Sequence, residues 1–261
     1  MENQNIKISI ILPNFNGEKY LKKALQSFVD QNYINKELII VDGKSTDNSH
    51  EIINDFIEKN KNIKWIKEKD TGISNAFNIG LKFTSGDVIG FLGSDDLIYR
   101  NLFDNINYIN SWSNFDSAYF NSYVFHINEK KCFLRHCPNL EINVYNLLTT
   151  GTIVAWQNMF FKKWIYEKYP LDENNRTCMD YELYLNICMN EKLLFIKSDS
   201  IGTINIFDNN ISQDKDGSQK KEVISVANKY AKLINFKGNL VWSNSYKYKL
   251  TLKKIIKLFL K

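Results

Sequence analysis

The chain is poor in the residues that mark disordered or membrane-spanning proteins. Only 3 of its 261 residues are proline and 11 are glycine, while 44% are hydrophobic and 14% aromatic. No apolar run approaches the roughly 20 residues that a helix needs to cross a bilayer. The N-terminus has no basic segment leading into an apolar one, as a secretory signal would. These absences exclude a disordered or membrane-spanning chain and predict a folded cytoplasmic protein with a sizeable core.

Cysteine is scarce and shows no paired spacing. None of the four cysteines stands in a C-x-x-C pair, which fits a reduced compartment. Two cysteines and two histidines lie close together along the chain: Cys132, Cys137, His126 and His136. Their spacing matches no familiar zinc motif, so ordinary packing is favoured over a metal site.

Acidic residues are missing from the end of the chain. The formal net charge is +5, and much of the excess lies in the acid-free segment 246–261. This distribution argues against nucleic-acid binding, which needs cationic groups across a whole face of the fold. Apolar residues interleaved with lysines at 252–260 predict a basic amphipathic helix on the inner membrane surface. A helix that packs back on the domain is the alternative.

Short apolar runs and helical patterns alternate over the first hundred residues. Expected strands cover 6–12, 37–41, 63–66 and 87–92, and expected helices cover 18–29, 46–57 and 75–83. This alternation predicts an α/β fold with a Rossmann-like, mostly parallel sheet flanked by helices and with ligands at the carboxyl ends of its strands. Further elements are expected as antiparallel strands at 116–127 and 131–135, a helix at 179–188, a strand at 193–206 and a helix at 220–234. The polar segment 208–219 is expected to be a loop or a boundary.

Polar residues follow each of the four expected strands. They form the segments 13–17 (PNFNG), 42–47 (DGKSTD), 70–72 (DTG) and 94–96 (SDD). An aromatic ring, carboxylates and small residues at one sheet edge suit a nucleotide held with a divalent cation. The chain has no G-x-G-x-x-G after its first strand and no P-loop, which argues against dinucleotide oxidoreductases and P-loop enzymes.

The pair Asp95 and Asp96 is the most informative of these residues. Mg²⁺ and Mn²⁺ take one or two protein carboxylates and complete their shell with water and phosphate oxygens. The pair therefore suits a metal-bridged diphosphate. In the alternative interpretation, Ser94 or Asp95 only caps a helix that begins near Leu97.

Three long runs resemble, in this order, the family 2 glycosyltransferases: SIILPNFNGEKYLKKALQSFVDQ, ELIIVDGKSTDNS and DTGISNAFNIGLKFTSGDVIGFLGSDD. The likeness covers roughly residues 6–100 and continues more weakly through MDYELYL at 179–185. It implies a GT-A type domain at 1–215, with a nucleotide-binding half at 1–100 and an acceptor-side half at 101–215. A C-terminal basic amphipathic helical region would follow at 216–261.

The resemblance also assigns residues to the donor nucleotide and to a metal. The implied nucleotide-binding residues are Pro13, Asn14, Phe15, Asn16, Asp42, Ser45, Asp70, Gly72, Asn75, Asn78, Ser94 and Asp95. Asp96 would hold Mn²⁺ or Mg²⁺. This chain departs from the usual pattern at four positions, where it has Lys44, Thr71, Asn75 and Ser94.

A catalytic base and an acceptor side are implied in the second half. Inverting transfer needs a carboxylate that takes the proton of the acceptor hydroxyl, and the matching residue is Asp180, with Glu182 in reserve. The spacing of Thr177 and Asp180 is also that of a helix cap, which is the structural alternative. Trp156 and Gln157 match acceptor-side positions, and Trp156 would either stack on a sugar or lie in the core.

Together these observations predict a metal-dependent, inverting glycosyltransferase that is peripheral on the cytoplasmic face of the membrane. It would move a hexose-type sugar from a nucleotide diphosphate sugar, with UDP-sugar favoured, to a lipid-linked glycan in bacterial surface polysaccharide biosynthesis. Two alternatives stay open. One is a nucleotidyltransferase on a related sheet, although the loop NFNG at 14–17 lacks the expected basic character. The other is a non-catalytic module that binds sugar nucleotides or membranes.

Overall fold

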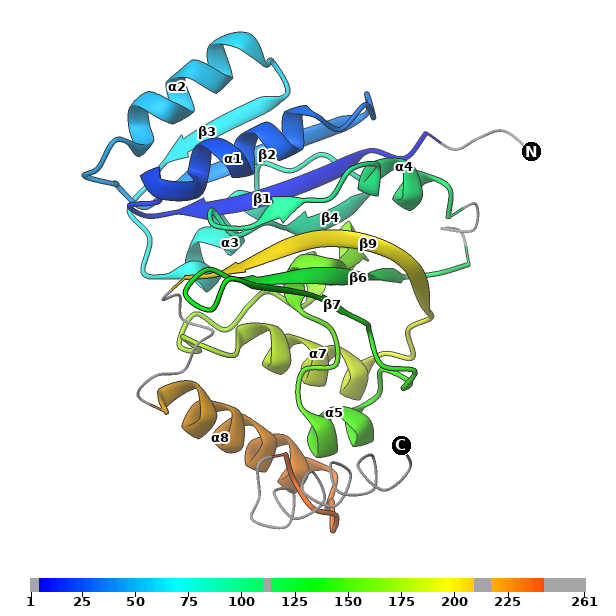
Figure 1. The fold of residues 1–261 in the computed structure, drawn as a ribbon. Coiled ribbons are helices and arrows are strands. Elements are labelled where there is room, and N and C mark those ends of the chain that lie inside the picture. The colour runs from blue at the N-terminus through cyan, green and yellow to red at the C-terminus, as the bar shows by residue number, and fades with distance from the viewer. Residues whose placement is uncertain (1–4, 110–113, 209–216, 242–261) are drawn as a thin grey trace.

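The computed structural model of the protein describes residues 5–109, 114–208 and 217–241 (Figure 1). The expected amphipathic helix at 246–261 lies outside the described residues, and so does most of the polar segment 208–219. The elements expected over the first hundred residues are all present.

The first half of the chain builds the parallel part of a sheet. Its strands are β1 (Ile8–Asn14), β2 (Lys36–Asp42), β3 (Ile63–Lys67) and β4 (Val88–Phe91), in the order β3-β2-β1-β4. The connecting helices are α1 (Glu18–Val29), α2 (Ser49–Lys59) and α3 (Ile73–Leu81). β1 and β2 are buried almost throughout, as expected for parallel strands that are covered on both faces. The α/β prediction is confirmed here.

The second half extends the same sheet with mixed pairing. β8 (Met159–Lys162) runs antiparallel to β4, β6 (Ser117–His126) antiparallel to β8, and β9 (Phe195–Phe207) parallel to β6. β7 (Lys131–Arg135) pairs antiparallel with β6, as the sequence predicts. With the short strand β5 (Leu97–Ile98), the described strands form one nine-stranded sheet in the order β3-β2-β1-β4-β8-β6-β9-β5, with β7 beside β6. The sheet is therefore parallel in its first four strands and mixed beyond them.

No helix begins near Leu97, so the capping role considered for Ser94 and Asp95 is wrong. Leu97 and Ile98 form the short strand β5, which pairs with Ile204 and Thr203 of β9. The next helix, α4 (Leu102–Asn107), begins only after this strand. The carboxylates at 95 and 96 therefore lie in a turn between two strands.

The other helices lie along the second half of the chain. They are α5 (Val144–Thr150), the 3₁₀ helix η1 (Trp156–Asn158), α6 (Lys163–Lys168), α7 (Met179–Asn190) and α8 (Ser218–Leu233). Two apolar cores cover the faces of the sheet. One contains Phe28 of α1 and Phe103 of α4, and the other contains Phe77 of α3 and Tyr184 of α7. The sheet thus separates two helical layers, as its buried strands require.

The helix α8 shares its core with the rest of the domain. Val226, Ala227 and Tyr230 are buried in the same cluster as Leu185 and Leu148. In Figure 1, α8 lies beside α7 and α5, at the end of the molecule away from β3. The boundary expected at 216 therefore does not separate two cores within the described residues. Residues 217–241 contain the helix α8, which buries its apolar face against α5 and α7, and the division of the chain at 216 stays a prediction.

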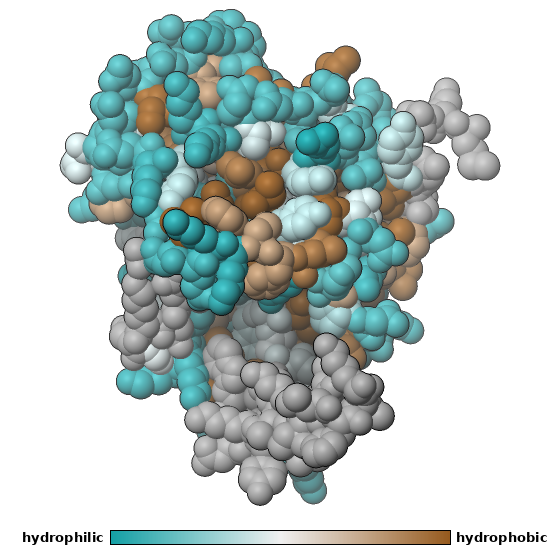
Figure 2. Space-filling model, in the orientation of Figure 1, coloured by the Kyte–Doolittle hydropathy of each residue, from teal (hydrophilic) through white to brown (hydrophobic). Residues whose placement is uncertain are grey.

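The surface is mainly hydrophilic on the face shown in Figure 2. Brown and white residues gather in the middle of that face, over the strands β6, β7 and β9. Every residue of β7 is exposed, including Phe133 at 49% and Leu134 at 37%. No described helix is long and apolar enough to cross a membrane.

Candidate functional site

The carboxyl ends of β1 and β2 form a buried polar cluster around Asp42. The parallel register of the strands sets Asn14 beside Asp42, and Asn14 Nδ2 donates to Asp42 Oδ2 at 2.8 Å. Ser45 donates to the same carboxylate from its backbone nitrogen, at 2.9 Å, and from its hydroxyl, at 2.7 Å. Burial alone would raise the pKa of Asp42, but these hydrogen bonds hold it below its usual range. Asp42 is therefore a fixed negative charge.

His50 completes this cluster, and the sequence analysis did not single it out. Its Nε2 lies 2.9 Å from Asp42 Oδ1, and its ring meets the Trp65 ring edge-on, with centroids 5.2 Å apart. His50 stands in the first turn of α2, eight residues after Asp42. The short loop between β2 and α2 could have indicated this contact in the sequence, because it keeps the first turn of α2 close to the end of β2.

Asn14, Gly17 and Ser94 meet at the end of β1. A Cβ at Gly17 would stand 2.2 Å from Asn14 Oδ1 and 3.1 Å from Ser94 Oγ, so no larger residue fits. Asn14 Oδ1 is buried and has no hydrogen-bond partner among the described residues. A buried acceptor without a donor costs about 1–3 kcal/mol, which a ligand N–H or O–H would recover. The neighbouring Phe15 ring is 65% exposed beside it.

The backbone is left-handed at two positions of this edge. Asn16 has φ 52° and Lys44 has φ 65°. Asn16 suits this conformation because its side chain bonds locally, and its Oδ1 accepts from Thr46 N at 2.8 Å. The Lys44 side chain forms no local hydrogen bond of this kind with a described residue. Its conformation explains why a small residue is the usual one at that position.

Asp70 packs against the end of β2. A Cβ at Gly43 would lie 2.4 Å from Asp70 Oδ2. The Asp70 carboxylate therefore packs directly against the backbone of Gly43, and no side chain fits there. Burial raises the pKa of Asp70, the hydrogen bond from Gly72 N opposes this, and the charge of Asp42 adds to the increase. Pro13, the other expected nucleotide-binding residue on β1, pairs in register with Val41 at the same edge of the sheet.

Arg176 supplies a cation beside the 70–72 loop. Its Nη1 donates to the carbonyl of Thr71 and lies 2.8 Å from the position of a Cβ at Gly72. Gly72 has φ 136°, a conformation that favours glycine. No local pattern marks Arg176 in the sequence, because 105 residues separate it from Thr71.

Asn75 and Asn78 hold the loop before α7 onto α3. Asn75 Nδ2 donates to Glu173 Oε2 at 2.9 Å, and Asn78 Nδ2 donates to Glu173 Oε1 at 3.0 Å. Asn78 Oδ1 also accepts from Leu171 N. These amides therefore position the 171–176 loop, and direct contact with a nucleotide stays a prediction for both residues.

Asp95 and Asp96 turn carboxylate oxygens toward one point. A Cβ at Gly93 would lie 2.8 Å from Asp95 Oδ1 and 3.0 Å from Asp96 Oδ2, so glycine leaves an open cradle between them. Asp96 is 3% exposed; its Oδ1 accepts from Ile206 N at 2.9 Å and its Oδ2 accepts from Gln157 Nε2 at 2.7 Å. Burial, followed by the charge of Asp95, raises the pKa of Asp96 to about 7.

This carboxylate pair fits the divalent cation that the resemblance implies. A cation between the two aspartates would offset their mutual repulsion, and hard oxygen donors are the ligands that Mg²⁺ and Mn²⁺ prefer. The described residues contain no group of three histidine, cysteine or acidic side chains placed to hold a metal. The remaining ligands would have to be water or phosphate oxygens. Among the described residues, His126, His136, Cys132 and Cys137 form no such group either.

Gln157 and Trp156 have different surroundings. Gln157 reaches Asp96, as given above, and so lies at the site. Trp156 is 4% exposed, stacks on Phe91 with ring centroids 4.0 Å apart, and donates from Nε1 to Tyr166 Oη at 3.0 Å. Stacking of Trp156 on a sugar is therefore wrong, because both the ring and its N–H are used inside the core.

Asp180 lies in the first turn of α7 and is partly exposed. Its Oδ1 accepts from Tyr181 N at 2.8 Å, and it forms no ion pair with a described residue. Burial raises the pKa of Asp180 to about 6, against the backbone hydrogen bonds and the charge of Arg135. Thr177 does not cap the helix, since its hydroxyl donates to Glu222 instead. The Asp180 carboxylate accepts a hydrogen bond from the backbone at the start of α7. This structural contact uses only one of its oxygens and is therefore compatible with a role as catalytic base.

Glu182 faces away from Asp180. It is 7% exposed, accepts from Asn175 Nδ2 at 2.8 Å and pairs with Lys229 of α8 at 2.7 Å. These contacts hold α7 to α8. The reserve assignment of Glu182 as base is wrong, because the side chain serves this ion pair.

Comparison with known proteins identifies the family. Residues 9–168 match the model of glycosyl transferase family 2. A Haemophilus influenzae protein described as a glycosyltransferase is 48% identical over 92 residues, which are 35% of this chain and 37% of that protein. The match thus spans little more than a third of that relative's length.

Solved structures share the fold at low sequence identity. Staphylococcus aureus TarS 1–349 in complex with UDP-GlcNAc superposes with a TM-score of 0.67 at 18% identity, covering 86% of this chain and 66% of that one. Glucosyl-3-phosphoglycerate synthase from Mycobacterium tuberculosis, in complex with Mn²⁺, UDP and glucosyl-3-phosphoglycerate, gives 0.59 at 15% identity, covering 86% and 78%. These neighbours establish the GT-A fold. Because the family model covers more than half of the chain, the protein belongs to glycosyltransferase family 2.

Proposed function

We propose that the protein transfers a sugar from a UDP-sugar to a hydroxyl group of a glycan acceptor, with inversion at the anomeric carbon. The observation that carries this proposal is the Asp180 carboxyl. It is partly exposed, has no ion pair among the described residues and has a pKa raised to about 6. Such a group is ionised near neutral pH and still accepts a proton readily, as a general base must.

The end of the parallel sheet would bind the nucleotide. Asp42 is held charged by Asn14 and Ser45, and the unsatisfied Asn14 Oδ1 is a ready acceptor for a donor hydroxyl or N–H. The exposed Phe15 ring offers a stacking surface, and Arg176 offers a cation near the 70–72 loop. The UDP and UDP-GlcNAc complexes of the structural neighbours favour a uridine nucleotide.

Asp96, with Asp95, would hold a divalent cation. When bound, Mn²⁺ or Mg²⁺ neutralises developing negative charge on a leaving diphosphate. Gln157 and the Ile206 backbone fix the Asp96 carboxylate in place for this role. The Mn²⁺ complex of the mycobacterial enzyme supports the assignment.

Residues of η1 link the surroundings of Asp96 to those of Asp180. Gln157 touches Asp96, and its neighbour Trp156 bonds Tyr166, whose pKa is raised by burial and further by the charge of Asp180. We propose an in-line reaction between these two carboxylates. Asp180 takes the acceptor proton while the acceptor oxygen forms the new glycosidic bond, and the bond to the nucleoside diphosphate breaks on the opposite face.

The acceptor is proposed to be lipid-linked and part of a bacterial surface polysaccharide. This rests on the resemblance and on the basic segment 246–261, which would bind anionic lipid on the cytoplasmic face. Co-sedimentation of the full chain with phosphatidylglycerol vesicles tests it. A variant with glutamine at Lys253, Lys254 and Lys257 should lose most of this binding, and equal binding by both proteins would contradict the proposal.

Calorimetric titration tests the donor site. UDP, GDP, CDP and dTDP are each titrated with Mn²⁺ and with a chelator, on the protein and on Asp96→Ala. UDP should bind with Mn²⁺ only, and Asp96→Ala should weaken it at least about tenfold. Asp55→Ala, which removes an exposed carboxylate on α2, is the control and should bind normally. Failure of every nucleotide to bind would overturn the proposed function.

The stereochemistry requires a separate measurement. Proton NMR of the transferred sugar should show the anomer opposite to that of the donor. A retained anomer would refute the single displacement and the role of Asp180 as base.

A further inference from the structure

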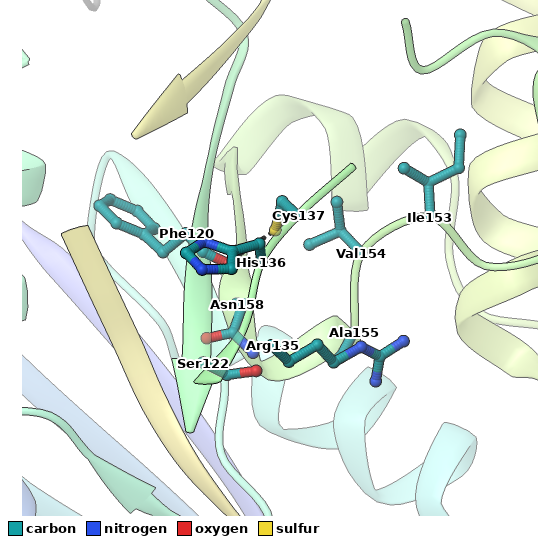
Figure 3. A pocket seen from close by; sticks show the side chains of 9 residues that line it. All are labelled: Phe120, Ser122, Arg135, His136, Cys137, Ile153, Val154, Ala155 and Asn158. Carbon is teal, nitrogen blue, oxygen red and sulfur yellow. Dashed lines mark hydrogen bonds between the residues drawn. The ribbon is translucent and has the colours of Figure 1, made fainter. Parts of the chain in front are cut away.

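A small pocket opens beside β7, on the acceptor half of the molecule (Figure 3). It lies between the C-terminal end of β7, with the part of β6 that faces it, and the segment that leads into η1. Its nine lining residues include Ser122, Arg135, His136 and Asn158, and none of the nine is acidic. In Figure 3 the Arg135 side chain extends toward the Ala155 side of the pocket, and His136 lies on the Phe120 side.

The basic groups of this pocket have no ion-pair or hydrogen-bond partner in the part of the chain that the structure describes. Both Arg135 and His136 are exposed. Among the described residues, the Arg135 guanidinium and the His136 ring form no hydrogen bond or ion pair. Lys131, at the other end of the same strand, is paired with Glu129 at 2.8 Å. Within the described residues, Lys131 is therefore neutralised by an ion pair, whereas Arg135 at the pocket has none.

The surroundings of the pocket are cationic as well. Burial raises the pKa of the Cys137 thiol, which lines the pocket, to about 11, and the charges of Arg135 and Lys197 oppose this increase. Ser122 is opposite Arg135 in the β6–β7 register, and its hydroxyl forms no hydrogen bond with a described residue. Guanidinium, imidazole and hydroxyl donors around one cavity are the parts of an anion site.

The pocket is connected to both proposed reacting groups. The charge of Arg135 acts on Asp180, so the two side chains lie within electrostatic range of each other. On the other side, Asn158 donates to Asn205 Oδ1 at 3.4 Å, and Asn205 in turn bonds Asp96. These contacts link the pocket to the surroundings of both carboxylates.

We propose that the mouth of this pocket, whose interior of about 10 Å³ admits only a group the size of a water molecule, binds an anionic group of the acceptor, a phosphate or a carboxylate, through Arg135 and His136. The inference rests on the proposed function, because it takes Asp180 as the group that receives the acceptor proton. It adds a substrate class, since the acceptor would be an acidic glycan or a sugar phosphate. Arg135 would also place the acceptor hydroxyl by holding the charged group beside it.

Binding of small probes tests the proposal. Methyl glucuronide is compared with methyl glucoside, and glycerol phosphate with glycerol, by NMR titration of the full chain with UDP and Mn²⁺ present and absent. At least one anionic probe should bind on the order of tenfold more tightly than its neutral partner, and the two pairs distinguish a carboxylate from a phosphate. Equal binding within both pairs would overturn the proposal.

Variants locate the site. Arg135→Gln should remove most of the preference for the anion, Arg135→Lys should keep part of it, and His136→Gln should reduce it less. Lys131→Gln removes a cation from the same strand and should bind as the unmodified chain does. Thermal unfolding midpoints verify that each variant is folded. If Arg135→Gln binds the probes normally and only shifts the pH dependence of the reaction, Arg135 acts on Asp180 alone and the anion site is refuted.

The two proposals fail in different ways. If UDP does not bind but the probes still require Arg135, the proposed function is wrong and the anion site remains. If UDP binds with Mn²⁺ and the probes ignore Arg135, the anion site is wrong and the proposed function remains.

Discussion

The donor and acceptor halves of the site hold their carboxylates in opposite ways. Asp42 is fully buried and accepts hydrogen bonds from Asn14 and from Ser45, and its pKa is held below the usual range. Asp180 bonds only the backbone of its own helix turn among the described residues, and its pKa is raised to about 6. The first arrangement is built for a permanent charge that orients a ligand. The second leaves a carboxyl that can change its protonation state.

Removal of the Asp180 charge should give the largest effect. Asp180→Asn keeps the shape of the side chain and the hydrogen bond from Tyr181 N but removes the base. Transfer should fall by about 10² to 10⁴, while calorimetric UDP affinity stays unchanged. Asp55→Asn on α2 is the control. Transfer within a few-fold of the unmodified protein would show that another group takes the proton.

Crowding of the donor half should affect binding rather than chemistry. Gly17→Ala places a methyl group 2.2 Å from Asn14 Oδ1, and Asn14 cannot move freely because Asp42 and Ser45 hold its amide. UDP affinity should fall about tenfold or more, with a smaller change in kcat at saturating donor. Gly217→Ala, where no described atom lies within 4 Å, is the control; its φ of 73° strains alanine and so lowers stability, but UDP affinity should stay unchanged. A loss confined to kcat would separate Gly17 from the donor.

The pH dependence of stability should distinguish Asp180 from Glu182. The folded pKa of Asp180 is raised from 3.8 to about 6, so the folded state binds this proton more tightly than the unfolded state does. The protein therefore loses stability as pH rises between these values. Asp180→Asn should be more stable than the unmodified protein by up to about 3 kcal/mol near pH 8, and most of the gain should be lost by pH 4.

Glu182→Gln is the matched change in the same helix and should have the opposite sign. It removes the ion pair with Lys229 and should destabilise the fold by about 1–2 kcal/mol at neutral pH. Urea unfolding at several pH values measures both variants. A destabilised Asp180→Asn protein at high pH would mean that the Asp180 carboxylate is structural.

The two halves also differ in how far the sequence predicts them. Asn14, Asp42 and Asp96 stand at the ends of apolar strands, so their shared edge follows from local periodicity and the parallel topology. The acceptor half depends on contacts between distant segments. Trp156 was ambiguous because burial against Phe91 and Tyr166 has no local signature, and Arg176 reaches Thr71 from 105 residues away. Arg135 lies on an expected strand, but its free guanidinium emerges only when the neighbouring loops are in place.

The smallest expected effect concerns Lys44, at the edge of the donor half. Its φ of 65° costs a side chain about 1–2 kcal/mol, and glycine would relieve this while making the unfolded chain more flexible. Lys44→Gly should therefore stabilise the fold by at most about 1 kcal/mol, measured by urea unfolding. UDP affinity should stay the same, because the Asp42 cluster involves no Lys44 side-chain contact among the described residues. Weaker UDP binding by Lys44→Gly would instead make Lys44 part of the donor site, and the strained backbone would then serve to present its charge.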